Sequence, residues 1–229
     1  MVAFVQNFAH EFLFTIHPDD VQRIRDKSSH ALGDIKAAEQ RAYIENFTTP
    51  FAFQHLFHWY LEHNKEIPTW TQFCDWMVSG AASNCWYAPL KNFLEINYPD
   101  GDRREWSRAA QWRLGKVYLS NIRELDLLAR LRHAGIPVRY HILADVLFRV
   151  DFWVGDALVC TYFPNPKYRE GEEGRKPPAN QFFANAKPPF HIAHVPIDRQ
   201  GFGQFWLATD ESVKQLVETI KPHLPDQEA

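Results

Sequence analysis

The sequence predicts a mixed α/β protein with a helical N-terminal region, and two observations indicate this fold class. Up to about residue 100, apolar residues recur at helical spacing between short breaks. Beyond residue 135 the pattern changes to alternating apolar and polar residues, with Gly and Pro between the runs. We therefore expect a helical region over residues 1–100. Residues 101–229 should form an α/β domain, whose mixed sheet has about four or five strands and is flanked by helices.

The composition is that of a globular protein. The 229 residues are 45% hydrophobic and 23% charged, so the chain is long enough to bury a substantial core. Aromatic residues make up 15%, which predicts an aromatic-rich core or an aromatic binding surface. A net charge of −3 gives no overall attraction for nucleic acid or an acidic membrane.

The cysteines and the hydropathy pattern bear on location. Cys74, Cys85 and Cys160 are odd in number and show no paired spacing, which is typical of a reducing compartment. No apolar run approaches the length that spans a bilayer. We expect a cytoplasmic protein that does not enter the membrane.

Helix signals divide the N-terminal region. A Pro followed by two Asp begins a predicted helix over residues 17–46. Residues 51–66 are apolar on nearly every side, which is typical of a central helix. Thr69 and Gln72 fit a capping box before the next helix, and a short helix is expected around residues 90–96.

A long helix is predicted from Arg103 to about His133, because Gly135 and Pro137 follow its apolar stripe. Basic residues outnumber acidic ones over residues 103–149. They predict a local basic patch, or alternatively a solvated helix face whose arginine stems cover apolar surface.

Strands are predicted after this helix. Alternation of apolar and polar residues predicts strands over 138–142 and 146–154, and Gly155-Asp156 predicts a hairpin turn into 157–163. Two further strands, at 190–197 and 204–209, and a last helix opened by residues 210–212 complete the predicted elements.

Several common chemistries are disfavoured. The sequence contains no Gly-x-Ser-x-Gly elbow, no phosphate-binding glycine loop and no dinucleotide fingerprint. Cys160 lies within a predicted strand and is better explained as a core residue than as a nucleophile. His55 and His58 are one helical turn apart, but without a zinc-binding motif they are better explained as partly buried histidines.

Glu124 on the long helix, Asp151 before a hairpin and the strand LVCTYF after it occur in a suggestive order. This order resembles the PD-(D/E)xK nuclease-like (restriction-endonuclease-like) superfamily, over roughly residues 115–220. The resemblance implies a restriction-endonuclease-like fold in which Glu124 and Asp151 help to bind Mg²⁺. Converging carboxylates suit this hard cation, which prefers oxygen ligands.

The sequence departs from the family at its third-strand motif. Thr161 stands where the family has an acid, and Phe163 stands where it has the lysine that helps to activate water. A tight hairpin would instead pair Asp151 with Cys160, which also supplies no carboxylate. Lys167 is the nearest available cation, so the catalytic residues implied are Glu124, Asp151 and Lys167. Alternatively, the two acids form structural pairs with neighbours such as Arg123 and Arg149.

The segment around residues 164–181 concentrates side chains that can contact phosphate or a base. In the resembled fold this segment lies beside the active site, although a solvated linker explains the composition as well. The nucleic-acid-binding residues that we expect are Arg139, Arg149, Lys167, Arg169, Arg175 and Lys176.

Together these features predict a nuclease-like DNA-binding protein whose active site is degenerate, so that enzymatic activity is left open. DNA is the expected partner. The alternative is a non-enzymatic subunit of a protein complex, which would dock on partners or on itself through the aromatic helices of residues 51–96.

Overall fold

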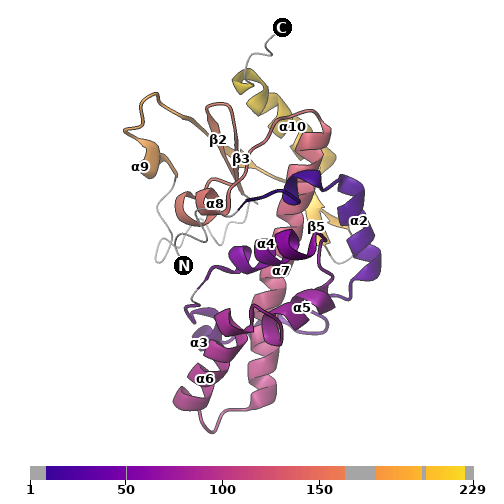
Figure 1. Ribbon diagram of the computed structural model, residues 1–229, viewed down its shortest axis with the longest axis vertical. Helices are drawn as coiled ribbons and strands as arrows, with labels where there is room; N and C mark the ends of the chain where they lie inside the picture. Colours follow the sequence, from indigo (N-terminus) through magenta and orange to yellow (C-terminus); the bar gives the residue numbers. More distant parts are fainter. Residues whose placement is uncertain (1–8, 50, 163–178, 203–204, 225–229) are drawn as a thin grey trace. The chain divides into compact units, whose positions relative to one another are not determined.

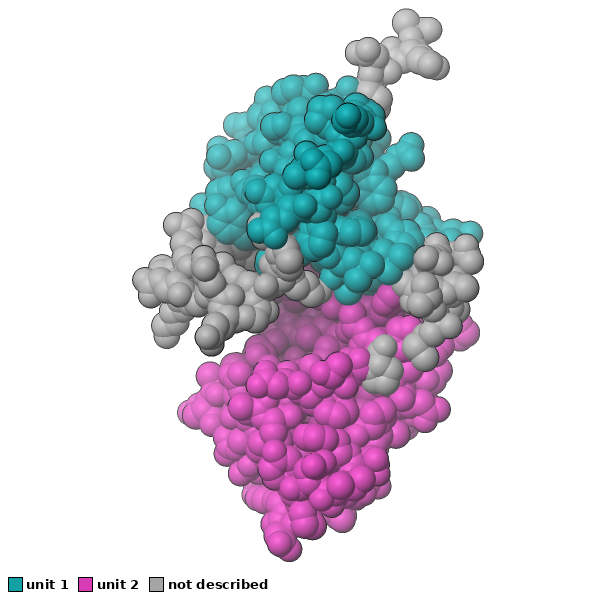
Figure 2. Space-filling model, turned by 90° about the vertical axis from the view of Figure 1, so that its left-hand side faces the viewer, with its two compact units in different colours: residues 1–18, 125–202, 206–229 teal, residues 19–124, 203–205 magenta. Residues whose placement is uncertain are grey.

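The computed structural model describes residues 9–49, 51–162, 179–202 and 205–224. It confirms a mixed α/β fold with a helical N-terminal region. The chain divides into two compact units, coloured in Figure 2. Unit 1 comprises residues 1–18, 125–202 and 206–229, and unit 2 comprises residues 19–124 and 203–205. No helix in the described ranges is both long and apolar enough to cross a membrane.

The long helix α7 has the bounds that the sequence predicts, Arg103–His133, and the division between the units falls within it (Figure 1). The helix ends where Gly135 adopts a φ of +81°, a conformation that glycine reaches without steric cost. Gly115 allows a close approach within unit 2, because an added Cβ would lie 2.7 Å from the Leu32 side chain and 3.0 Å from the Ala31 carbonyl oxygen.

Helices α3 to α6 of unit 2 are grouped around the first half of α7 (Figure 1). Their core is aromatic: the rings of Phe57, Phe73 and Tyr118 are fully buried and pack within 6.2 Å of one another, centroid to centroid. Much of the aromatic content of this region therefore forms a core. The helices are α2 (Pro18–Lys27), α3 (Ala42–Glu45), α4 (Phe53–Asn64), α5 (Trp70–Val78) and α6 (Tyr87–Asn97), with short 3₁₀ turns at Ala37–Glu39 and Ser83–Cys85.

The start of α5 confirms the predicted capping box. The Thr69 hydroxyl accepts a hydrogen bond from the Gln72 amide at 3.3 Å, and the Thr69 amide donates to the Gln72 side chain at 2.8 Å. In addition, the amide of Trp70 donates to the Ser28 hydroxyl at 2.8 Å. Backbone donors that the first turn leaves unsatisfied thus find side-chain acceptors.

The prediction of one helix over residues 17–46 is wrong, because α2 ends at Lys27. The Nδ1 atom of His30 accepts hydrogen bonds from the amides of Leu32 and Gly33, and Gly33 has a φ of +55°. Local bonds between side chain and backbone of this kind compete with the helical pattern. The apolar spacing persists beyond Lys27 because Ala31, Ile35 and other residues still point into the core.

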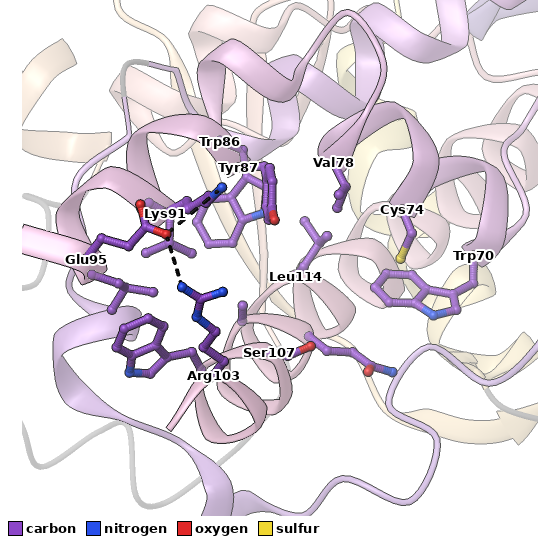
Figure 3. A pocket seen from close by; sticks show the side chains of 15 residues that line it. Trp70, Cys74, Val78, Trp86, Tyr87, Lys91, Glu95, Arg103, Ser107 and Leu114 are labelled. Atoms are coloured by element: carbon purple, nitrogen blue, oxygen red, sulfur yellow. Dashed lines mark ion pairs between the residues drawn. The ribbon is translucent and has the colours of Figure 1, made fainter. Parts of the chain in front are cut away.

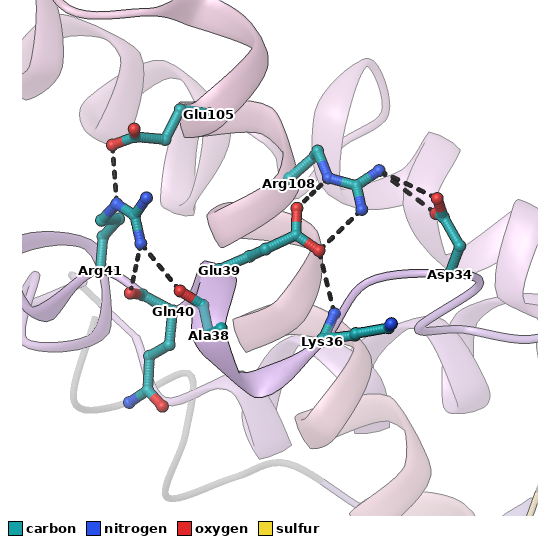
Figure 4. Close-up of polar contacts among 8 residues, drawn as sticks. All are labelled: Asp34, Lys36, Ala38, Glu39, Gln40, Arg41, Glu105 and Arg108. Atoms are coloured by element: carbon teal, nitrogen blue, oxygen red, sulfur yellow. Dashed lines mark hydrogen bonds and ion pairs between the residues drawn. The ribbon is translucent and has the colours of Figure 1, made fainter.

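Ion pairs join the segment that follows α2 to α7 (Figure 4). The Arg108 guanidinium binds both oxygens of Glu39 and lies 3.2 Å from Asp34, and it lowers the pKa of Glu39 to about 2. The Arg41 guanidinium donates to Glu105 at 2.8 Å. These arginines hold the segment in place without a helix.

Unit 1 contains a three-stranded mixed sheet in the order β1 (Phe152–Val154), β2 (Ala157–Tyr162), β3 (His191–Pro196). The Gly155-Asp156 hairpin between antiparallel β1 and β2 is confirmed, since Val154 pairs with Ala157. Strand β3 runs parallel to β2, and helix α9 (Ala179–Phe183) lies between them in sequence. A separate two-stranded sheet joins β4 (Arg199–Phe202) to β5 (Phe205–Ala208).

The prediction of strands over 138–142 and 146–154 is wrong where helix α8 covers Ile142–Phe148, and it is confirmed at Phe152–Val154. The Nδ1 atom of His141 accepts from the Leu143 amide at 3.1 Å and caps the helix. Arg149 ends it with a φ of +59°. Of the predicted strand residues, Phe152–Val154 form β1, and Arg139 keeps a single bridge to Trp153.

Arginines near the end of α7 are engaged within unit 1. The Arg130 guanidinium donates to the Ala208 carbonyl at 2.7 Å and to Asp210 at 2.6 Å, and it lies 3.5 Å from the buried Asp126. Arg132 donates to the carbonyls of residues 13 and 16. Together with Arg108, these residues bind other elements of the fold, so the basic character of α7 largely serves its packing. The last helix, α10 (Asp210–Ile220), begins at the Thr209 cap.

Candidate functional site

The resemblance directs attention to Asp151, which immediately precedes β1. One of its carboxylate oxygens, Oδ2, accepts hydrogen bonds from the Thr161 amide at 2.6 Å and from the Thr161 hydroxyl at 2.5 Å. The Asp151 amide donates to the Val159 carbonyl at 2.9 Å. The backbone amide and the side chain of Asp151 therefore both bond to β2, at the end of the hairpin away from its turn.

The contact lies at the end of the hairpin's regular pairing. The last pair is Phe152 with Val159, and the Asp151 amide and carboxylate bond to Val159 and Thr161, so the predicted pairing of Asp151 with Cys160 stays a prediction. Cys160 is buried, and burial together with the nearby Asp151 raises the pKa of its thiol to about 11. A thiol of this kind is neutral near pH 7 and does not serve as a nucleophile.

Asp151 is half-buried, and burial has the largest effect on its pKa. Burial raises the pKa of Asp151 to about 6, while the Thr161 hydrogen bonds and the charge of Arg149 act in the opposite direction. The predicted association of Asp151 with Arg149 is therefore present as an electrostatic effect. Val150, the residue before Asp151 in the chain, belongs to an apolar cluster with Leu158, Cys160 and Ala179. The hydrogen bonds from Thr161 stabilise the charged form of the carboxylate at this position.

These contacts do not fit a bound magnesium ion. Thr161 stands where the resembled family has an acid, and its hydroxyl donates a hydrogen bond to Asp151. Within the described ranges, no group of three or more His, Cys, Asp or Glu side chains could hold a metal ion. Glu124, the second acid of the predicted pair, is a half-buried residue of α7 and belongs to unit 2, whereas Asp151 belongs to unit 1. We assign no chemical step to a metal ion.

The predicted nucleic-acid-binding residues divide into two groups. Arg139 and Arg149 are exposed in unit 1, one on the bridge to β1 and the other at the end of α8. The remaining predicted residues lie outside the described residues, and they are Lys167, Arg169, Arg175 and Lys176. The predicted contribution of the 164–181 segment therefore stays a prediction.

The structure adds a pair that the sequence analysis missed. Trp206 on β5 is 52% exposed, and the Arg199 guanidinium of β4 lies 5.4 Å from the centre of its ring. An exposed tryptophan beside a cation can stack a nucleobase and contact a phosphate. The alternation in the predicted strand over 204–209 carried the signal, because it points Trp206 away from its buried neighbours Phe205 and Leu207.

Comparison with protein families, with curated proteins and with solved structures found no match for this chain.

Proposed function

We propose that this chain is a nuclease-like protein that binds DNA in the cytoplasm and does not cleave it. The order of elements in unit 1 supports the nuclease-like part of the proposal: the end of α7, a paired segment at Arg139, the β1–β2 hairpin, α9 and the parallel strand β3. A helix, a hairpin preceded by an acid and a following strand are the features on which the resemblance rests.

The observation that carries the proposal is the contact between Asp151 and Thr161. In active members of the resembled superfamily the corresponding acid helps to hold a metal ion. Here Asp151 is half-buried, and its carboxylate accepts two hydrogen bonds from the residue that stands in place of the second acid. Asp151 thus supports the hairpin. Among the described residues, no group of ligands is present for the metal ion that the family's chemistry requires.

Exposed cationic and aromatic side chains in unit 1 support the binding role. Arg139, Arg149 and Arg199 are exposed, and Trp206 offers a ring face next to the last of them. Arginines contact phosphates independently of sequence, and an aromatic ring stacks any base. We therefore propose that the protein binds DNA with low sequence specificity. Stacking on Trp206 would add affinity where the DNA is single-stranded. The alternative of a docking subunit acting through residues 51–96 stays a prediction.

A single experiment addresses both parts of this function. A labelled DNA duplex and its single strand are incubated with the protein in Mg²⁺ or Mn²⁺, and each sample is analysed on a native gel and on a denaturing gel. We expect retarded mobility on the native gel and intact strands on the denaturing gel. Cleavage that disappears in Asp151→Ala would show an active nuclease and contradict the proposal. Unretarded DNA at low salt would contradict the binding role.

A further inference from the structure

Unit 2 contains a cleft of about 520 Å³ between α5, α6 and the first half of α7 (Figure 3). This volume lies within the range of small-molecule sites. Apolar and aromatic side chains line the walls along the length of the cleft. Charged side chains gather at one end, where Arg103 lies. The residues of the cleft belong to unit 2 alone.

The apolar walls are held in place by contacts behind them. Trp86 is almost fully buried, and the Arg113 guanidinium lies 5.4 Å from the centre of its ring. Arg113 in turn donates hydrogen bonds to the carbonyls of Ile44 and Phe47, at 2.5 and 2.8 Å. The Trp70 ring packs against the buried ring of Tyr118, with 5.5 Å between the centroids. A wall supported in this way loses little conformational freedom when a ligand binds.

The opposite wall contains Trp106 from the first turn of α7. Gly101 lies so close to this indole that an added Cβ would be 2.7 Å from its Nε1 atom. Only a residue without a side chain allows the ring to occupy that position. Leu114, also nearly fully buried, continues the apolar wall along α7.

The charged end carries a net positive charge. Lys91 and Arg103 share the single carboxylate of Glu95, at 4.0 and 3.9 Å. Both distances are long for an ion pair, and the side chains remain 54% and 85% exposed. Two cations around one anion leave one positive charge facing the cleft. An anionic group of a ligand would complete this arrangement.

We propose that this cleft binds a small aromatic anion, a planar ring system that carries one carboxylate or sulfonate group. The ring packs between the tryptophan-lined walls, and the anionic group lies at Lys91 and Arg103. This site is separate from the DNA-binding role proposed for unit 1, and it gives unit 2 a ligand of its own. It also differs from a protein docking surface, because the walls are concave and supported from behind.

Two fluorescent probes with the same rings test the proposal. 8-Anilinonaphthalene-1-sulfonate carries the anionic group, and N-phenyl-1-naphthylamine lacks it. We expect the anionic probe to bind the full chain with one-to-one stoichiometry. The double change Lys91→Gln and Arg103→Gln should weaken the anionic probe by about three- to tenfold, as loss of partly exposed charge pairs does, and change the neutral probe by less than about twofold.

A second variant tests the apolar part. Ser107 is exposed at the rim of the cleft, so Ser107→Phe fills the mouth with little risk to folding, and Ala110→Phe fills it more deeply. We expect each to weaken both probes by at least about tenfold. Arg104→Gln, which changes an exposed α7 residue outside the lining, should leave both probes unaffected.

Three results would overturn the proposal. If the charge variant lost affinity equally for the two probes, Lys91 and Arg103 would not bind the anionic group. Unchanged binding of both probes in both filling variants would place the probes elsewhere. Binding with high stoichiometry and no saturation would mark nonspecific adsorption. Far-ultraviolet circular dichroism of every variant separates these results from loss of fold.

Discussion

The Asp151 carboxylate accepts two hydrogen bonds from Thr161, one from its amide at 2.6 Å and one from its hydroxyl at 2.5 Å. This relationship joins the residue before β1 to a residue of β2 across the hairpin. Under the proposed function, this structural contact replaces the metal ligation that the corresponding acid provides in the resembled superfamily. The predictions about this site follow from its half-buried, hydrogen-bonded state.

Replacing Thr161 with Val should raise the pKa of Asp151 above about 6. Burial already raises this pKa, and the Thr161 hydroxyl lowers it by stabilising the charged form, so loss of the hydroxyl leaves burial less opposed. Carboxyl carbon shifts in ¹³C NMR, followed against pH and assigned with Asp151→Asn, measure the change. An Asp151 pKa near 4 in the parent chain would mean that the carboxylate is solvated and that the contact is misassigned.

The same shift gives a pH-dependent contribution to stability. Because the folded pKa is raised, folding favours the protonated acid, and this contribution is present below about pH 4 and is lost as the pH rises through about 6. The stability difference between the parent chain and Asp151→Asn should therefore change by at most about 3 kcal/mol across this window. Asp126 has a pKa raised in the same direction, but it is present in both proteins and cancels.

Arg130→Gln should destabilise unit 1 by about 3 kcal/mol, since it leaves the buried Asp126 without its cation and removes the bond to the Ala208 carbonyl. It should also raise the pKa of Asp126 above about 6, because Arg130 is a group that lowers it. Urea unfolding followed by circular dichroism measures the first effect. Arg104→Gln, an exposed change on the same helix, is the control and should alter stability by no more than about 0.5 kcal/mol. Equal effects of the two changes would contradict the role of Arg130.

Thr69→Ala should destabilise unit 2 by about 1 kcal/mol, because it removes the side-chain acceptor at the start of α5. Thr71→Ala makes the same chemical change two residues later, at an exposed position inside the helix. There we expect a small gain, since Ala is the better helix former. Chemical unfolding of both variants provides the comparison, and a similar loss in both would argue against the capping role.

Trp206→Ala should weaken binding of single-stranded DNA by about five- to 150-fold, as the loss of one stacked base does, while duplex binding changes little. Arg199→Gln should weaken both forms of DNA through lost phosphate contact. Tyr87→Ala, at a partly exposed ring in unit 2, is the matched control and should have no effect. Fluorescence anisotropy with labelled strands measures all three. Equal loss for single strand and duplex in Trp206→Ala would refute base stacking.

The sequence predicted elements whose signals are local. The bounds of α7, the capping box at Thr69 and the Gly155-Asp156 hairpin each depend on residues within a few positions of one another, and the structure confirms all three. Helix α8 was mistaken for a strand because its apolar residues also fit alternation, and its decisive feature is the cap from His141. A cap formed by a histidine ring is a weak sequence signal.

The candidate site was predictable only in part. The register of the hairpin followed from its two-residue turn, since the length of the turn determines the pairing from Val154 with Ala157 to Phe152 with Val159. The two hydrogen bonds from Thr161 were not expected, because they depend on how the chain enters β1 just outside the regular pairing. Contacts between residues far apart in sequence, such as Arg130 with Ala208, leave no local pattern. Basic residues on α7 therefore suggested a surface patch, although several bind within the fold.

The central claim, that this chain binds DNA, is tested most directly by the salt dependence of its affinity for a labelled duplex. If Arg139, Arg149 and Arg199 each contact a phosphate, the affinity should fall by at least about 40-fold between roughly 50 and 200 mM salt. A steep linear decrease of log affinity with log salt concentration is the result that the proposed function predicts. Absence of binding at low salt, or an affinity that does not change with salt, would contradict it.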